Sequence, residues 1–129
     1  MYYRKGIGLS YSTHELAKQI VAAINKKKVL DLKVLDVQGL TPLTEMFIIA
    51  VASNVRQTKA IADEVEEVVQ EFAEKSPIHK EGYQTAQWIL LDYGEVIVHI
   101  LDEEDAAFYA LDRLWKDAEH IDFQEVVSV

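Results

Sequence analysis

The chain contains no cysteine, which excludes disulfide bonds, thiol catalysis and cysteine-ligated zinc, and favours an intracellular setting. It has only five glycines, and these are scattered, so no glycine-rich loop is available to hold a phosphate group. No apolar run approaches the roughly 20 residues of a membrane span, and the first residues lack the apolar core of a secretory signal. We therefore expect a cytoplasmic protein.

Basic residues are also in short supply. The 13 lysines and arginines are outnumbered by 22 acids, which gives a formal net charge of −9. Direct nucleic-acid binding draws most of its affinity from basic side chains on phosphates, so this balance disfavours it. A basic protein is the better match as a partner. The length of 129 residues suits one domain, 1–129, with a core of ordinary size.

The stretch WILLDYGEVIVHIL, from Trp88 to Leu101, has two apolar runs on either side of a turn. With Tyr93 and Gly94 as the central residues, Asp92 would lie opposite Glu95 in a tight β-hairpin. Side chains alternate along a strand, so one face becomes wholly apolar and belongs in a core. That face holds Ile89, Leu91, Val96, Val98 and Ile100.

The other face of this hairpin is amphipathic. Two like charges would sit opposite each other at its tip, which favours a basic group between them. This face looks suited to a partner, although a bulge at the turn would exchange the faces of one strand. The predicted partner-binding residues are Trp88, Leu90, Asp92, Tyr93, Glu95, Ile97 and His99.

The remaining elements follow from caps and periodicity. Ser12 and Glu15 form a capping box before a helix, Asn54 caps a second helix that runs to about Lys75, and Asp102 caps a third. Apolar residues at 61, 65, 68 and 72 form the core stripe of the second helix. Strands are expected at 29–37 and 46–53.

The predicted order is therefore α-β-β-α-β-β-α, an α+β fold with a small mixed β-sheet and helices mainly on one face. Three helices can cover one face only. The opposite face would be partly bare, with the Trp88 and His99 side of the hairpin lying there.

No residue constellation points to catalysis or to a metal. The four histidines fall at no metal-ligand spacing, so we expect no metal and no cofactor. The acidic run 102–105 opens a predicted helix, where the helix dipole already favours acids. No serine lies in a Gly-x-Ser-x-Gly elbow.

Four stretches together carry a resemblance: LDVQGLTPLTEMFIIA, RQTKAIADEVEE, EGYQTAQWILLDYGEVIVHIL and FYALDRLWKDAE. From about residue 13 to 118 they resemble the ribosomal silencing factor family, also called RsfS or Iojap-like proteins. The order and spacing of the tryptophans, glycine and histidine make the resemblance specific. The chain departs from the family pattern at Ala52, where glycine is usual, and near Ala106, where arginine is usual.

The resemblance implies a non-catalytic factor that binds the large ribosomal subunit through its basic ribosomal protein fourteen. By occupying the subunit interface, such a factor blocks joining of the small subunit and lowers translation in nutrient limitation. A homodimer is compatible with the family. Trp88 and Tyr93 would anchor the partner, the two acids at the tip would meet its basic groups, and Leu90 and Ile97 would fill the apolar centre.

Three alternatives stay open at this stage. The family fold is similar to that of nucleotidyltransferases, so a metal-dependent enzyme using Asp63 or Glu64 is the rival function, although these acids are adjacent on a helix and the Gly-Ser turn is replaced by Ala-Ser-Asn. A ribosome-independent homo-oligomeric scaffold is the third class. For Trp88 and His99, ordinary core packing or a mutual cross-strand contact would also explain the residues.

Overall fold

The computed structural model describes residues 11–103, 113, 116 and 118–121. Within them it has two helices and six strands. Their bounds are α1 Thr13–Asn25, β1 Asp31–Asp36, β2 Met46–Ala52, α2 Val55–Ala73, β3 His79–Glu81, β4 Trp88–Asp92, β5 Val96–Asp102 and β6 Glu119–His120. Neither described helix is long and apolar enough to cross a membrane. The α+β class is confirmed.

Both helices begin at the predicted caps. The Ser12 hydroxyl accepts from the Glu15 amide, and the Glu15 carboxylate accepts from the Ser12 amide, which completes the capping box. Asn54 accepts from the Gln57 amide at 2.9 Å. Helix α2 ends at Ala73, slightly before the predicted Lys75, because Glu74 adopts a left-handed conformation with φ of 54°.

The strands form one mixed sheet in the order β3-β4-β5-β2-β1-β6. The central pair β2 and β5 is parallel, and the other neighbours are antiparallel. Edge strand β3 is absent from the predicted order, because its three residues, His-Lys-Glu, have no apolar pattern; all three are exposed in the structure. Charged residues of this kind are common on edge strands, where they discourage pairing with other chains.

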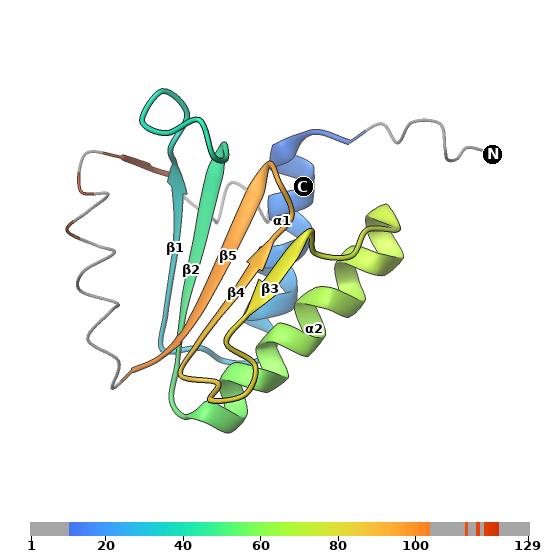
Figure 1. The fold of residues 1–129 in the computed structure, drawn as a ribbon, viewed down its shortest axis with the longest axis vertical. Coiled ribbons are helices and arrows are strands. Elements are labelled where there is room, and N and C mark those ends of the chain that lie inside the picture. The colour runs from blue at the N-terminus through green and yellow to red at the C-terminus, as the bar shows by residue number, and fades with distance from the viewer. Residues whose placement is uncertain (1–10, 104–112, 114–115, 117, 122–129) are drawn as a thin grey trace.

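The two helices lie side by side on one face of the sheet (Figure 1). Apolar side chains from both helices and from this face of the sheet form the main core. Ile61 and Val65 are fully buried as predicted, but Phe72 is 36% exposed. The fully buried stripe of α2 continues instead through Val69 and Ala73, at a spacing of four residues, while the Phe72 ring lies at the border of the core against Tyr11.

The opposite face carries a second, smaller apolar cluster: Leu35, Val37, Phe47, Ile49, Ile97, Leu101 and Ala118. Each is at most 8% exposed, so the prediction of a partly bare face is wrong at the centre of the sheet. Exposure is retained on β4, where Trp88 and Leu90 are half-buried. The predicted third helix lies largely outside the described residues, and Asp102, its expected cap, is the last residue of β5.

Candidate partner-binding face

The β4–β5 hairpin turns one residue later than predicted. Tyr93 donates its amide to the Val96 carbonyl at 2.9 Å, so Gly94 and Glu95 are the central residues and Asp92 pairs with Ile97. Gly94 adopts φ of +92°, which a glycine at the first central position of a hairpin turn tolerates without strain.

This shift corrects each predicted cross-strand pair but keeps the faces. Trp88 lies opposite Leu101 rather than His99, and His99 lies opposite Leu90. Each partner moves by two residues, and side chains repeat with a period of two, so the predicted core face is unchanged. Its five members, Ile89, Leu91, Val96, Val98 and Ile100, are all 0% exposed.

Trp88 and His99 nevertheless meet, diagonally across the two strands. The Trp88 indole Nε1–H donates to His99 Nδ1 at 3.0 Å, and the Phe47 ring meets the imidazole in a T-shaped contact. His99 is 5% exposed, and burial lowers its pKa to about 4. Its neutral form therefore accepts at Nδ1 and carries its proton on Nε2, a buried atom that has no hydrogen-bond partner among the described residues.

Gly82 fixes the approach of the chain to Trp88. A Cβ atom at position 82 would lie 1.9 Å from the Trp88 carbonyl oxygen, and the glycine has φ of +87°, so no other residue fits without a backbone shift. The loop between them is closed by the Ala86 amide, which donates to the Gly82 carbonyl at 2.8 Å. The tryptophan is thus held by backbone packing at the start of β4.

The structure divides the seven predicted partner-binding residues into two groups. Trp88 and Leu90 lie half-buried on the sheet face opposite the helices, which we call the second face. They lie above the buried Ile97 and His99, and we call these four residues the Trp88 patch. Asp92, at the end of β4, uses its Oδ1 to accept from the Gly94 amide at 2.8 Å.

The other two predicted residues, Tyr93 and Glu95, belong to the opposite side. Tyr93 is 0% exposed in the main core, where burial raises the pKa of its phenol, and within the part of the chain that the structure describes its hydroxyl has no hydrogen-bond partner. Glu95 forms an ion pair with Lys75 at 2.9 Å. The expected repulsion between Asp92 and Glu95 across the hairpin is therefore absent, because the later turn places Glu95 at its tip.

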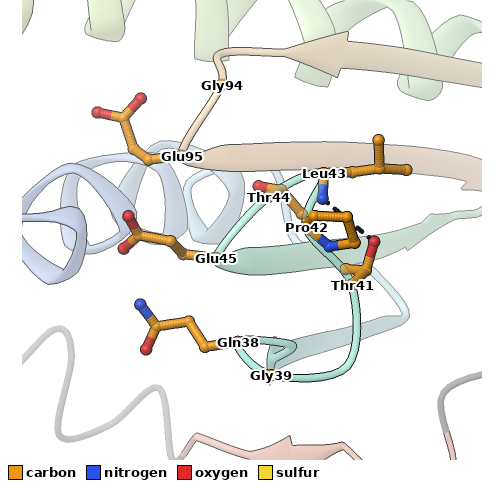
Figure 2. Close-up of a pocket in the computed structure, with 9 residues that line it drawn as sticks. All are labelled: Gln38, Gly39, Thr41, Pro42, Leu43, Thr44, Glu45, Gly94 and Glu95. Carbon is orange, nitrogen blue, oxygen red and sulfur yellow. Dashed lines mark hydrogen bonds between the residues drawn. The ribbon is translucent and has the colours of Figure 1, made fainter.

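A hollow of about 500 Å³ lies beside Glu95, between the β1–β2 loop and the hairpin turn. Figure 2 shows Gln38, Glu45 and Glu95 extending their side chains to the same side, while Leu43 points the other way. Both carboxylates are engaged by the chain itself, since Glu45 accepts from the Thr13 hydroxyl at 2.7 Å and Glu95 binds Lys75. Sequence reasoning missed this hollow because its lining comes from two loops far apart in the chain.

The two acids that the rival enzymatic function would use, Asp63 and Glu64, contact different partners. Asp63 accepts from the Tyr83 hydroxyl at 2.7 Å, whereas Glu64 pairs with Lys26 at 3.5 Å. Among residues 11–103 and the few later ones described, no group of three potential metal ligands comes together. Both acids thus have structural contacts of their own.

Comparison with known proteins decides the family. The model of the family described as "Ribosomal silencing factor during starvation" matches residues 10–129, which is nearly the whole chain. The chain belongs to this ribosomal silencing factor family. The match extends the residues 13–118 of the sequence resemblance at both ends, and it places the chain among non-enzymatic factors that regulate translation.

Curated relatives agree with the family, the two bacterial ones over most of their length. The chain is 33% identical over 117 residues to the ribosomal silencing factor RsfS of Halalkalibacterium halodurans, covering 91% of this chain and 99% of the relative. It is 31% identical over 103 residues to RsfS of Bacillus subtilis, covering 80% and 86%. The chloroplastic protein Iojap of Zea mays is 30% identical, with 46% of its length covered.

Two solved structures share the fold of this silencing factor family member. A crystal structure of a protein from Bacillus halodurans superposes with a TM-score of 0.75 at 31% identity, covering 84% of this chain and 97% of that one. An X-ray structure of a protein from Chromobacterium violaceum gives 0.77 at 29% identity, covering 82% and 88%.

Proposed function

We propose that this chain binds the large ribosomal subunit through its basic ribosomal protein fourteen and blocks joining of the small subunit by occupying that surface. Family membership implies ribosome binding. The observation that carries the choice of surface is the Trp88 patch, where an indole and a leucine remain half-exposed over a buried histidine.

An aromatic side chain of this kind is a suitable interface anchor. Tryptophan contributes a large apolar area with few rotatable bonds, and interface energy concentrates in such residues. The hydrogen bond to His99 holds the indole, and the close approach of Gly82 to the Trp88 carbonyl holds the backbone beneath it, before any partner arrives. A fixed anchor loses little conformational entropy on binding, which preserves more of the contact energy as affinity.

Charge supports a basic partner. The chain has a net charge of −9, and Asp92 lies on β4 two residues beyond Leu90, at the edge of the Trp88 patch. Attraction between an acidic and a basic protein raises the association rate and weakens with salt. Tyr93 supports the turn from within the core rather than contacting the partner, because it is fully buried.

Sedimentation through a sucrose gradient tests the proposal. The purified protein should comigrate with large subunits and reduce their joining to small subunits. Trp88→Ala should lower the affinity by at least about 30-fold, since loss of an interface anchor costs ~2 kcal/mol or more. Phe72→Ala is a matched control, because Phe72 is a partly exposed aromatic on α2, on the opposite side of the sheet.

The same gradient can contradict the proposal in two ways. If the wild-type protein stays at the top of the gradient at near-physiological salt, while a known subunit-binding factor sediments, the chain does not bind ribosomes. Equal losses for the Trp88 and Phe72 variants would keep ribosome binding but move the interface away from the Trp88 patch.

A further inference from the structure

At one end of the molecule, four basic side chains lie where the end of α1 is close to the start of α2. Lys27 and Lys28 follow the last turn of α1, and Arg56 and Lys59 belong to the first two turns of α2. Lys28, Arg56 and Lys59 are exposed and Lys27 is half-buried. We call these four residues the basic end; within the described part of the chain none of them forms an ion pair.

The Gln57 side chain ties this end together. Its Nε2 donates to the Lys27 carbonyl at 2.6 Å and reaches the Lys28 carbonyl at 3.4 Å. Its Oε1 accepts from both the amide and the hydroxyl of Ser53, at 2.7 and 2.9 Å. One amide therefore holds the backbone of the two lysines against the start of α2.

Local physics disfavours two of these residues where they stand. The start of a helix carries partial positive charge and prefers acids, yet the first turn of α2 has no acid and contains Arg56. Lys28 adopts φ of +56°, a left-handed conformation in which glycine would be less strained. The dipole of α1 favours a positive charge near Lys28 but does not explain its left-handed backbone, and the dipole of α2 opposes the charge of Arg56.

Acidic residues near the basic end limit the area of its positive charge. Glu64 pairs with Lys26, Asp31 accepts from the Leu32 amide with its own Oδ1, and Asp102 and Glu103 lie at the end of β5. The positive charge that has no ion pair among the described residues thus belongs to the helix side of this end. Together with the partial positive charge at the start of α2, it forms a surface suited to an extended polyanion.

We propose that the basic end contacts the phosphate backbone of ribosomal RNA when the Trp88 patch is bound to the large subunit. The inference rests on the proposed function, which brings the chain to a particle rich in RNA. An acidic protein is repelled by phosphate over most of its surface, so an exposed, unpaired basic end is where RNA can come close. Contacts of this kind position the protein without reading base sequence.

The sharpest variant removes charge without weakening the fold. Lys28→Gly relieves the left-handed backbone, and Arg56→Gln removes a cation from the start of α2, so the double variant should melt no lower than wild type. Its net charge falls by two. Lys18→Glu lowers the net charge equally from the middle of α1, and serves as the matched control.

Binding to large subunits and to isolated ribosomal protein fourteen is measured across a salt series. The double variant should bind subunits about tenfold less tightly, with a salt slope shallower by about one to two, while binding the isolated protein as wild type does. Lys18→Glu should change subunit binding much less. Unchanged subunit binding by the double variant would overturn the RNA contact alone, whereas a wild type that binds neither target would overturn the proposed function as well.

A second readout uses the absence of cysteine from the chain. A hydroxyl-radical probe attached through Val55→Cys, at the basic end, should cleave ribosomal RNA in bound subunits. A probe at Leu43→Cys, in the hollow of Figure 2, should cleave it less. Cleavage no stronger from position 55 than from position 43 would contradict the proposal. A membrane surface is the other possible target of the basic end. If the wild type binds vesicles of acidic phospholipid, and the double variant loses this binding but keeps subunit binding, the proposal is contradicted.

Discussion

Along β5, side chains alternate between two faces that differ in chemistry. Val96, Val98 and Ile100 face the helices and are 0% exposed, within the main core. On the other side, Ile97 and Leu101 belong to the smaller cluster, and the buried His99 between them accepts from the half-buried Trp88. One face therefore contributes chiefly to stability, whereas the other keeps an exposed indole surface that a stable core alone would not require.

Two adjacent leucines of β4 give the largest expected contrast. Leu91→Ala should lower the free energy of unfolding by about 3 to 4 kcal/mol, because it opens a cavity in the main core. Leu90→Ala should cost about 1 kcal/mol, since that side chain is half-buried. Urea denaturation measures both, and equal losses would erase the distinction between the faces.

His99 makes the second face sensitive to acid. Its pKa of about 4 in the folded chain lies below the ordinary 6.5, so the unfolded chain takes up the proton first. The neutral His99 therefore makes its full contribution to the free energy of unfolding above about pH 6.5. This contribution is lost as the pH falls from about 6.5 to 4, by about 3 kcal/mol in total. Unfolding by urea at pH 7 and at pH 4.5 measures this loss.

A substitution isolates the contribution of His99 from that of the acidic residues. His99→Asn retains an oxygen that can accept from the Trp88 indole but does not titrate, so its stability should fall less between the two pH values. If the His99 variant loses as much stability between the two pH values as wild type does, other groups are responsible for the loss.

Trp88→Phe tests the hydrogen bond within the second face. The ring is largely retained but the N–H is lost, which leaves the buried His99 Nδ1 without its donor and should cost about 1 to 2 kcal/mol. Thermal unfolding measures the loss. No change in stability would mean that the hydrogen bond contributes little and that Trp88 is retained for binding alone.

The smallest expected effects concern the two acids near the hairpin turn. Glu95→Gln removes the ion pair with Lys75, whose side chains are 29% and 24% exposed for lysine and glutamate, and should cost about 0.5 kcal/mol after solvent screening. Asp92→Asn keeps an oxygen for the Gly94 amide and should cost less still. Denaturant midpoints resolve the two, and a larger loss for Asp92→Asn would mean that its charge matters.

Sequence patterns predicted the main core well because it depends on local regularities. The caps at Ser12 and Asn54 and the alternation of the hairpin each fix a face without knowledge of distant residues. The hairpin faces were correct even though the turn was misplaced, since the error moved each partner by two residues. A one-residue error in pairing would have exchanged them.

The candidate site was predicted less completely because its contacts are not local. The same turn shift separated Glu95 from Asp92 and paired it with Lys75, twenty residues earlier in the chain. Tyr93 is buried with Ile89 and Leu91, whose alternation it continues, but the predicted turn placed it at the hairpin tip and so outside that alternation. The Gln57 amide that organises the basic end likewise bonds to residues about thirty positions away.

The parallel pairing of β2 with β5 has a consequence for how the chain is made. Each partner lies 50 positions further along the chain, as Met46 with Val96 shows. At about 5 to 20 residues per second, translation needs roughly 3 to 10 s to supply β5 after β2. During that interval all seven residues of β2, which are buried in the finished protein, lack their central neighbour. The contacts with β1 and α2 are the ones that the earlier part of the chain can supply to shield this strand from aggregation during synthesis.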